Sequence, residues 1–194
     1  MINVLKYGNT NTFIIKGSNC NLLIDTDYAG TLSNFYKAIK EINIKVSDIK
    51  YVLATHYHPD HIGLISELMK QGVKLVLVDF QKQFVHFSDK IFKKDKHLNY
   101  EVINENNAII ISIEESRNFL KNMGINGEII KITSHSDDSI SIILDNGECI
   151  VGDLEPYEYT LSYINNKKLE SDWNKIYEYN PKVINYSHRP KKEL

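Results

Sequence analysis

Short apolar runs separated by turn residues occupy the first 25 positions of the chain. The runs lie at 2–7, 12–16 and 21–25, and Gly8-Asn9 and Gly17-Ser18-Asn19 stand between them. Apolar runs rich in β-branched residues and broken by Gly and Asn every few positions suit strands joined by tight turns. The pattern predicts an antiparallel meander at the start of the chain.

Further along, apolar residues recur every three or four positions, and short continuous apolar runs lie between these segments. The spacing predicts helices at 32–42 and 62–69, the second ending at Gly72 as a left-handed cap. The continuous runs predict buried strands at 51–54 and 73–78. Residues 80–110 show no stable period, and we expect a loop with short helical pieces there.

The rest of the chain repeats this layout. Ser112 and Glu115 form a capping-box pattern that predicts a helix over 113–123. Apolar runs predict strands at 128–132, 139–144 and 148–151, the last two joined by a hairpin at Asn146-Gly147. A helix at 172–179 and a strand at 183–186 follow. This order of elements predicts a layered α/β protein with two similar halves, forming a single domain over residues 1–194.

Composition excludes several classes of protein. The 194 residues are 42% hydrophobic and 25% charged, and 23 Lys plus Arg against 25 Asp plus Glu give a net charge of −2. No apolar run approaches the roughly 18 residues that cross a bilayer, and no basic excess favours a nucleic-acid backbone. Two distant cysteines indicate neither a disulfide framework nor a thiolate metal site. Since no signal peptide is evident, we expect a cytoplasmic protein.

Three of the seven histidines lie within six residues, directly after the strand predicted at 51–54. In extended backbone, residues two apart point the same way, so His56 and His58 can bind one ion together. Asp60 and His61 follow at the turn into the next helix and approach from a different part of the loop. The segment therefore predicts a metal site with room for a second ion nearby.

Three further candidate ligands each follow an apolar run. His135 comes after the strand at 128–132, Asp153 after that at 148–151, and His188 after that at 183–186. Open α/β architectures gather their sites at the carboxyl ends of strands. We therefore expect these three side chains to join the histidine motif.

With these residues the sequence resembles the metallo-β-lactamase superfamily over nearly its whole length. Asn21-Leu22-Leu23-Ile24-Asp25-Thr26 is similar to the family's early strand, and His56-Tyr57-His58-Pro59-Asp60-His61 to its HxHxDH motif. His135, Gly152-Asp153 and His188 match its later ligand positions in order. The resemblance implies a four-layer αβ/βα sandwich with two mixed β-sheets flanked by helices. It also implies one metal on His56, His58 and His135, another on Asp60, His61 and His188, Asp153 bridging, and Asp25 orienting the ligand loop.

The types of ligand predict the chemistry. Imidazole and carboxylate groups without cysteine suit two divalent ions, with Zn²⁺ as the first expectation and Mn²⁺ or Fe as alternatives. Two such ions can lower the pKa of a water between them towards about 7 and polarise the bond that it attacks. Asp60 can take part in proton transfer as well as in ligation. We predict a hydrolase acting on an ester, lactone, thioester or related bond.

Departures from family patterns narrow the range of expected substrates. An aspartate at position 153 rather than a cysteine argues against β-lactam hydrolysis. With six residues after His188, we do not expect the glutathione thioesters that glyoxalase-II-type thioesterases bind with a C-terminal helical region. Acyl-homoserine lactonases carry a tyrosine three residues after the bridging aspartate, where this chain has Pro156. Tyr157, one position later, is a candidate substrate-binding residue that would stabilise an oxyanion.

Alternative functions stay open at the level of sequence. An iron-dependent oxygenase similar to persulfide dioxygenases would use His56, His58, His135 and Asp153 around one iron. An RNA-processing nuclease would need a basic surface, for which the only local cluster is Lys90, Lys93, Lys94 and Lys96. A metal-binding protein without catalysis is a further alternative. We expect a small-molecule substrate and no nucleic-acid or membrane partner, and the sequence is compatible with a homodimer.

Overall fold

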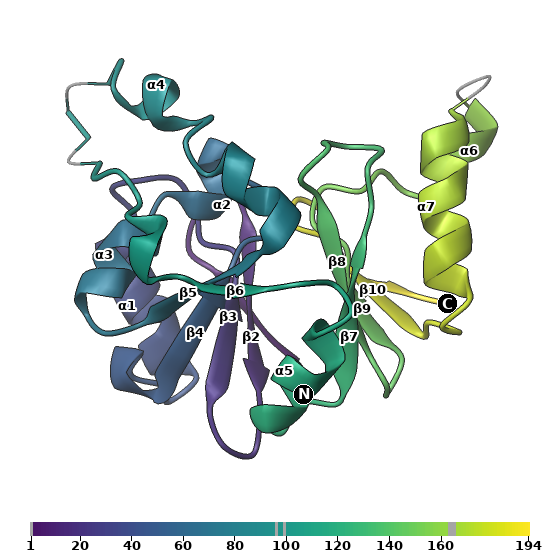
Figure 1. The fold of residues 1–194 in the computed structure, drawn as a ribbon, viewed down its shortest axis with the longest axis horizontal. Coiled ribbons are helices and arrows are strands. Elements are labelled where there is room, and N and C mark those ends of the chain that lie inside the picture. Colours follow the sequence, from purple (N-terminus) through teal and green to yellow (C-terminus); the bar gives the residue numbers. More distant parts are fainter. Residues whose placement is uncertain (1, 96, 99, 163–165) are drawn as a thin grey trace.

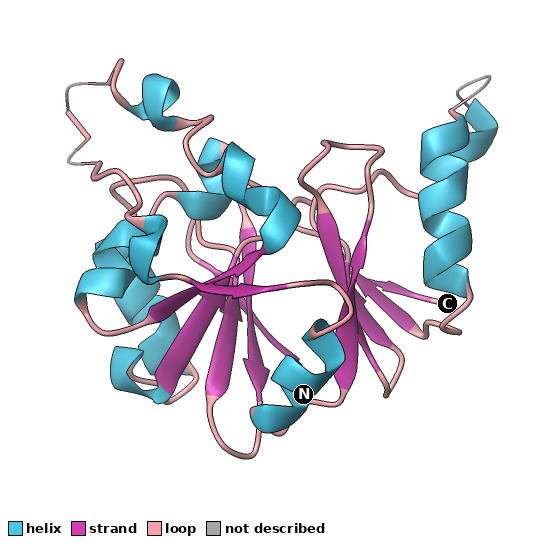
Figure 2. Ribbon diagram, viewed as in Figure 1, coloured by secondary structure: helices cyan, strands magenta, loops and turns pink. Residues whose placement is uncertain are grey.

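Two mixed β-sheets face each other, and helices cover their outer sides (Figures 1 and 2). The computed structural model describes residues 2–95, 97–98, 100–162 and 166–194. The first half of the chain forms one sheet and the second half forms the other. The four-layer αβ/βα sandwich implied by the resemblance is therefore confirmed.

The first sheet has six strands in the order in which they occur along the chain. They are β1 (Ile2–Lys6), β2 (Asn11–Lys16), β3 (Asn21–Ile24), β4 (Ile49–Leu53), β5 (Lys74–Val78) and β6 (Ile109–Ile111). The first three strands pair antiparallel, as the meander predicts, and β3 to β6 pair parallel. Helix α1 (Leu32–Glu41) connects β3 to β4 and α3 (Ile65–Lys70) lies between β4 and β5, which is the crossover that parallel strands require.

The second sheet has five strands in the order β11-β10-β9-β8-β7. They are β7 (Gly127–Lys131), β8 (Ile140–Leu144), β9 (Glu148–Ile150), β10 (Val183–Asn185) and β11 (Lys192–Glu193). Only β9 and β10 pair parallel within it. The predicted hairpin at Asn146-Gly147 joins β8 to β9, with Gly147 at φ +92° and its N–H donating to the Leu144 carbonyl at 2.9 Å.

Three apolar clusters hold the four layers together. Because successive residues of a strand point to opposite faces, Leu23 packs outward against Phe35 of α1, while Leu22 and Ile24 point inward between the sheets. Ile142 of β8 belongs to the same central cluster. A third cluster joins the outer face of the second sheet to α7 (Lys167–Tyr177) through side chains that include Trp173, Ile176 and Ile184.

The helix predicted over 62–69 is wrong in one respect, because it forms two helices. Helix α2 (Pro59–Ile62) ends before α3 begins at Ile65. The backbone groups that would continue the helix bind Thr26 instead. Its N–H donates to the His61 carbonyl at 2.9 Å, and its hydroxyl accepts from the Leu64 N–H at 3.2 Å. The break therefore ties the loop after β3 to the histidine segment.

Two other predictions need correction. Helix α7 begins at Lys167, five residues before the predicted start at 172, because the Asn166 side chain caps it by accepting from the Leu169 N–H at 3.1 Å.

In the irregular segment 80–110, short helical pieces form as expected at α4 (Asp89–Phe92), η2 (Asp79–Phe84) and η3 (Glu105–Asn107). Its last residues, however, begin β6, an edge strand that pairs with β5 over only three positions. Three further short elements, η1 (Val46–Asp48), α6 (Tyr159–Ser162) and β11, were not predicted.

The capping box at the start of α5 (Ser116–Asn122) is confirmed. The Ser112 N–H donates to the Glu115 carboxylate at 2.8 Å, and the Glu115 N–H donates to the Ser112 hydroxyl at 3.3 Å. A turn over 113–115 lies between this box and the first helical residue, so the helix is shorter than predicted.

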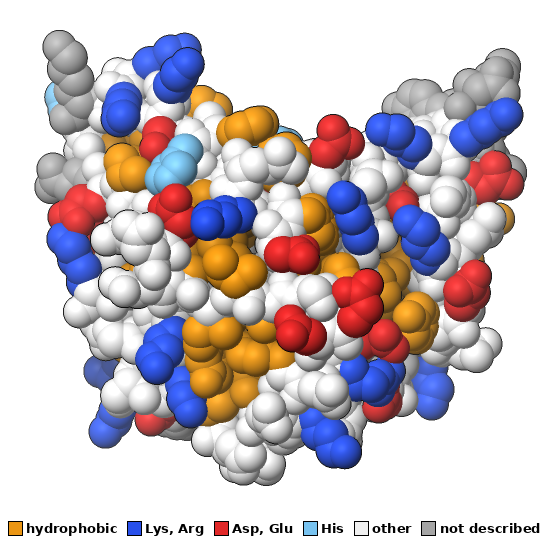
Figure 3. Space-filling model, viewed as in Figure 1, with side chains coloured by type: hydrophobic (Ala, Val, Ile, Leu, Met, Phe, Trp, Pro, Cys, Tyr) orange, Lys and Arg blue, Asp and Glu red, His pale blue; other side chains and the backbone are white. Residues whose placement is uncertain are grey.

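The surface carries charges of both signs. On the face shown in Figure 3, Lys and Arg side chains alternate with Asp and Glu. Of the predicted lysine cluster, Lys90, Lys93 and Lys94 lie at or just after α4, and Lys96 is outside the described residues. None of the helices in the described ranges has the length and apolar character needed to cross a membrane.

Gly72 adopts the left-handed conformation predicted for the cap of α3. It has φ +95°, and its N–H donates to the Met69 carbonyl at 3.0 Å. A Cβ added there would meet nothing within 4 Å, so backbone strain is the whole cost of a side chain. We expect Gly72→Ala to lower the free energy of unfolding by about 1 kcal/mol in urea titrations, and Gly72→Asn by less, because Asn tolerates this conformation. Equal losses would mean that backbone strain is not the cause.

Candidate metal centre

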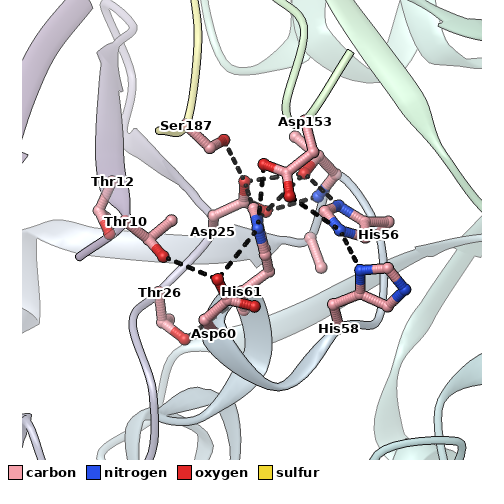
Figure 4. Close-up of polar contacts among 12 residues, drawn as sticks. Thr10, Thr12, Asp25, Thr26, His56, His58, Asp60, His61, Asp153 and Ser187 are labelled. Carbon is pink, nitrogen blue, oxygen red and sulfur yellow. Dashed lines mark hydrogen bonds and ion pairs between the residues drawn. The ribbon is translucent and has the colours of Figure 1, made fainter. Parts of the chain in front are cut away.

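The seven predicted ligands lie at one end of the sandwich, although they are spread over more than 130 positions of the chain. Five of them follow the carboxyl end of a strand: His56 and His58 follow β4, His135 follows β7, Asp153 follows β9 and His188 follows β10. Asp60 and His61 lie in α2. Figure 4 shows side chains from both halves of the chain meeting around Asp153.

The first group that could hold a metal ion consists of His56, His58, His135 and Asp153. His58 Nδ1 lies 3.0 Å from His56 Nε2 and 3.1 Å from His135 Nε2. Asp153 Oδ2 lies 3.6 Å from His135 Nε2 and 3.8 Å from His56 Nε2. The extended backbone at His58, with φ −73° and ψ 154°, lets side chains two positions apart converge.

The second group consists of Asp60, His61 and His188. His188 Nε2 lies 3.1 Å from Asp60 Oδ2, and His61 Nε2 lies 3.9 Å from the same oxygen. Asp153 reaches this group with its other oxygen, since Oδ1 lies 3.3 Å from both His61 Nε2 and His188 Nε2. One carboxylate thus faces both groups, one oxygen to each.

The donor atoms fit metal ions in spacing and in chemistry. Ligand atoms about 2.0–2.1 Å from a tetrahedral Zn²⁺ are about 3.3 Å from one another, and the donor atoms here are separated by 3.0–3.9 Å. His61 Nε2 and Asp153 Oδ1 are buried polar atoms without a hydrogen-bond partner. Because unpaired buried polar atoms are costly, a cation between the two atoms would account for both.

Asp25 makes polar contacts with the ligand loop. Its buried carboxylate accepts hydrogen bonds from the Thr55 N–H at 2.6 Å and the Thr55 hydroxyl at 2.8 Å, and it lies 2.9 Å from His61 Nδ1. When the ring proton is on His61 Nδ1, the lone pair of Nε2 is available to a metal ion at the second group. The Ser187 hydroxyl, next to His188, donates to the same carboxylate at 3.4 Å. Asp25 thus contacts Thr55, His61 and Ser187, and its role in orienting the ligand loop stays a prediction.

Two further carboxylates hold ligand loops, and sequence reasoning missed both. Asp138 is buried, and its Oδ2 accepts from the N–H of Tyr57, between His56 and His58, at 2.6 Å. Asp172 in α7 is also buried, and its Oδ2 accepts from the N–H groups of Thr133 at 2.8 Å and Ser134 at 2.7 Å. An aspartate within the apolar stripe of α7 was the available signal for the second of them.

The glycine before Asp153 is required by close packing. Gly152 has φ +58°, and a Cβ added there would lie 2.8 Å from the Thr55 hydroxyl. Its carbonyl accepts from the Ser187 N–H at 3.0 Å. Gly152 thus lets the loops after β4, β9 and β10 approach one another, which brings Asp153 to the histidines of both halves.

The pKa values of two histidines in the first group are lowered, and those of the two histidines in the second group are raised. Burial, together with neighbouring histidines, lowers the pKa of His56, and burial lowers that of His135 as well. Burial alone would also lower the pKa of His61, but the carboxylates of Asp25 and Asp153 outweigh it and raise the value to about 10. The carboxylates of Asp153 and Asp60, which lie 3.3 Å and 3.1 Å from its Nε2, raise the pKa of His188 to about 10.

The two carboxylates at the centre are ionised. Burial opposes the charge of each, but the surrounding histidines outweigh it and lower the pKa of both Asp60 and Asp153, that of Asp153 far below its usual range. The raised pKa values of His61 and His188 thus accompany the lowered values of the two carboxylates that face them.

One side of the site is buried in the protein, and the other side is open to solvent. His56 and His61 are buried, whereas His58, His135 and His188 are exposed. A cavity of about 120 Å³ adjoins His135, Asp153 and His188. Tyr157 is not among the residues that line this cavity, and its ring packs against Trp173 and Tyr177 of α7. The contact between Tyr157 and substrate stays a prediction.

A family model and a curated protein are similar to this chain. The family model described as the metallo-beta-lactamase superfamily matches residues 5–188. A diflavin flavoprotein (A 3) of Nostoc sp. strain PCC 7120 is 28% identical over 103 residues, which is 48% of this chain. The match covers only 18% of that relative.

Solved structures match over nearly the whole chain. A metallo-beta-lactamase family protein of Thermus thermophilus has a TM-score of 0.73 at 16% identity, with 100% of this chain and 74% of that chain covered. The subclass B3 metallo-beta-lactamase BJP-1 of Bradyrhizobium japonicum has a TM-score of 0.66 at 18% identity, covering 96% and 74%. A protein solved in a di-iron-bound form has a TM-score of 0.72 at 16% identity, covering 100% and 94%. At these identities the matches establish the fold.

Proposed function

The chain belongs to the metallo-beta-lactamase superfamily, and from this premise we propose that it hydrolyses an ester-type bond of a small molecule with the help of two divalent metal ions. The observation that carries the proposal is the position of Asp153. Its Oδ2 lies within 3.8 Å of nitrogens of the first ligand group, and its Oδ1 lies 3.3 Å from two nitrogens of the second. A carboxylate shared in this way suits a pair of ions.

The proposed ligands follow from the two groups. His56, His58 and His135 would hold one ion, Asp60, His61 and His188 the other, and Asp153 would bridge them. Zn²⁺ is the first choice for such nitrogen and oxygen donors, with Mn²⁺ or Fe as alternatives. When bound there, two such ions would supply Lewis-acid chemistry, which lowers the pKa of water near neutral pH and polarises the bond to be cleaved.

Asp60 is the residue proposed to move a proton. Its pKa is lowered, so its carboxylate is ionised at neutral pH and can accept a proton. Oδ2 accepts a hydrogen bond from the Thr10 hydroxyl at 3.5 Å and lies 3.1 Å from His188 Nε2. About a third of the Asp60 side chain is exposed, so the carboxylate reaches the open side of the site. This combination supports a role in proton transfer in addition to ligation.

The size of the cavity and the net charge of the chain support a small molecule as the substrate. The cavity beside the ligands is small, and the chain has a near-neutral net charge of −2, which gives nucleic acid no general attraction. We propose no nucleic-acid or membrane partner and a cytoplasmic location. We also propose that the protein can form a homodimer.

Iron chemistry is the second candidate. One structural neighbour was solved with two irons, so iron is a metal that this fold accepts. A mononuclear oxygenase would use His56, His58, His135 and Asp153 alone. The assembly of Asp60, His61 and His188 into a second group favours the dinuclear hydrolase over this alternative.

Elemental analysis of the purified protein, followed by assays with lactone, thioester, aryl ester and phosphodiester substrates, tests the proposal. We expect two equivalents of metal per chain and turnover that a chelator abolishes and added metal restores. One iron per chain with thiol-dependent uptake of oxygen, and no hydrolysis of any substrate, would replace the hydrolase by the oxygenase.

Proton release on metal binding should differ between the two groups. At pH 7 the metal-free protein holds His56 and His135 neutral, because their pKa values are lowered, but His61 and His188 protonated, because theirs are raised to about 10. A metal needs neutral imidazole, so the second equivalent should release about two protons and bind more tightly as pH rises towards 10. Titration calorimetry in buffers of different ionisation enthalpy measures this release. Equal proton release for both equivalents would contradict the assignment.

A further inference from the structure

One of the two arginines of the chain lies beside the proposed metal ligands. Of the 23 Lys plus Arg residues, only Arg117 and Arg189 are arginine. Arg189 directly follows His188 and lines the cavity of about 120 Å³ that adjoins His135, Asp153 and His188. A cationic side chain with a planar array of donors therefore reaches the open side of the site.

Two hydrogen bonds and one cation–π contact hold the guanidinium group of Arg189 in place. Nη2 donates to Glu155 Oε2 at 3.1 Å, Nη1 donates to the Tyr159 hydroxyl at 3.5 Å, and the group lies 5.3 Å from the centre of the Tyr159 ring. The Arg189 carbonyl accepts from the Asn11 side chain at 3.0 Å, which fixes the backbone. A guanidinium has five N–H donors, so these contacts leave three of them without a partner in the described residues.

Glu155 shows what kind of group the arginine can receive. It lines the same cavity, and its carboxylate accepts a single hydrogen bond from Arg189, although a guanidinium can bind a carboxylate or phosphate with two parallel bonds. Both side chains of this ion pair are about half exposed, so the pair is weak and open to competition. A substrate anion can therefore displace Glu155 without breaking a buried interaction.

Arg117 provides a contrast within the same chain. Its guanidinium is shared by three carboxylate oxygens, two of Asp145 at 3.0 Å each and one of Glu128. It does not line the cavity beside the metal ligands. Arg117 is thus engaged on another part of the surface, and it serves as a matched control.

We propose that Arg189 binds an anionic group of the substrate, a carboxylate or a phosphate, in the cavity beside His188. The inference names the substrate class of the proposed hydrolase and in that respect rests on the proposed function. The substrate would be a small ester-type molecule that carries its negative charge a few bonds from the bond to be cleaved. Arg189 acts as a specificity-determining residue and Glu155 as the internal group that it releases.

The first test does not depend on activity. The purified protein is treated with 2,3-butanedione, which modifies arginines, and the modified peptides are quantified by mass spectrometry with succinate, inorganic phosphate, or chloride at the same ionic strength. We expect succinate or phosphate to slow the modification of Arg189 several-fold relative to chloride and to leave Arg117 unchanged. The comparison of succinate with phosphate identifies the preferred anion. Equal slowing of both arginines, or no protection of Arg189, would overturn the proposal.

Glu155→Gln sharpens this test. The change removes the competing charge but keeps the backbone carbonyl of Glu155, which accepts from Trp173 Nε1 at 2.8 Å. If Arg189 receives the anion, succinate or phosphate should protect it at a lower concentration in this variant. If Arg189 has only a structural role, the concentration of succinate or phosphate that protects it will not fall, and the proposal fails.

The second test uses substrates of equal length. We compare 4-nitrophenyl hexanoate with the mono-4-nitrophenyl ester of adipic acid, which adds a terminal carboxylate. Arg189→Ala should raise KM for the charged ester relative to the neutral one by roughly 10- to 100-fold, the range expected for a charge-assisted hydrogen bond, and Arg189→Lys by less. Arg117→Ala should leave the ratio unchanged. An unchanged ratio in Arg189→Ala would refute the inference, whereas no hydrolysis of either ester with intact protection of Arg189 would refute only the proposed function.

Discussion

Asp153→Ala is expected to leave the protein with less than two equivalents of metal and to lower kcat by more than the roughly 10–100-fold that is typical for residues that only support a ligand. The reason is that one carboxylate serves both ligand groups. Oδ2 faces His56 and His135, and Oδ1 faces His61 and His188. Its removal takes a donor from each group and the negative charge from between two cations. Elemental analysis and steady-state kinetics on the same preparation measure both effects.

Asp137→Ala is the matched control. It also deletes a carboxylate near the site, two residues after His135, but this side chain is 76% exposed and its partner is Lys168 at 3.9 Å. Metal content and kcat should stay at the wild-type level. If Asp153→Ala retains two ions and normal turnover, Asp153 does not bridge and the dinuclear proposal is wrong.

Asp25→Ala is expected to lower the free energy of unfolding of the metal-free protein by about 3–5 kcal/mol, the usual cost of breaking a buried ion pair. Asp25 and His61 are both fully buried and 2.9 Å apart, and removal of the carboxylate takes from His61 the nearest of its counter-charges and leaves Asp153 at 3.3 Å. The Thr55 N–H and hydroxyl lose their acceptor as well. Urea unfolding in the presence of a chelator measures the loss without a contribution from bound metal. A loss below about 1 kcal/mol would mean that the buried network is not a major source of stability.

Asp25→Asn separates the effect of Asp25 on stability from its effect on metal binding. Asp25 has φ +59°, a conformation that Asn adopts readily, so the backbone should be preserved and the loss of stability should be smaller than for Asp25→Ala. An amide that donates to His61 Nδ1 would move the ring proton to Nε2, the atom that faces Asp153 and Asp60. We expect a folded protein that binds its second metal ion at least about tenfold more weakly. Unaltered binding of both ions would show that Asp25 has no part in orienting His61.

The sequence alone predicted most elements of the fold and the residues of the site, because both depend on local patterns. The meander of β1 to β3, the cap at Gly72 and the hairpin at Gly147 each follow from residue types a few positions apart. His56, His58, Asp60 and His61 are recognisable because their spacing is itself the signal. The elements missed were short ones, such as β6 and β11, which form only because a longer strand beside each provides partners.

The tertiary structure decided what the sequence could not, namely which distant groups meet and at what spacing. That one oxygen of Asp153 faces each ligand group depends on the loops after β4, β9 and β10 approaching one another at Gly152. The loops are held by Asp138 and Asp172, whose acceptors reach N–H groups 81 and 38 or more residues away. The charge of His61 and His188, and the place of Arg189 beside them, likewise arise from neighbours brought close by folding. Burial and electrostatic coupling depend on distance in space, which is why the sequence determined the candidate ligands and only the packed sandwich determined their geometry.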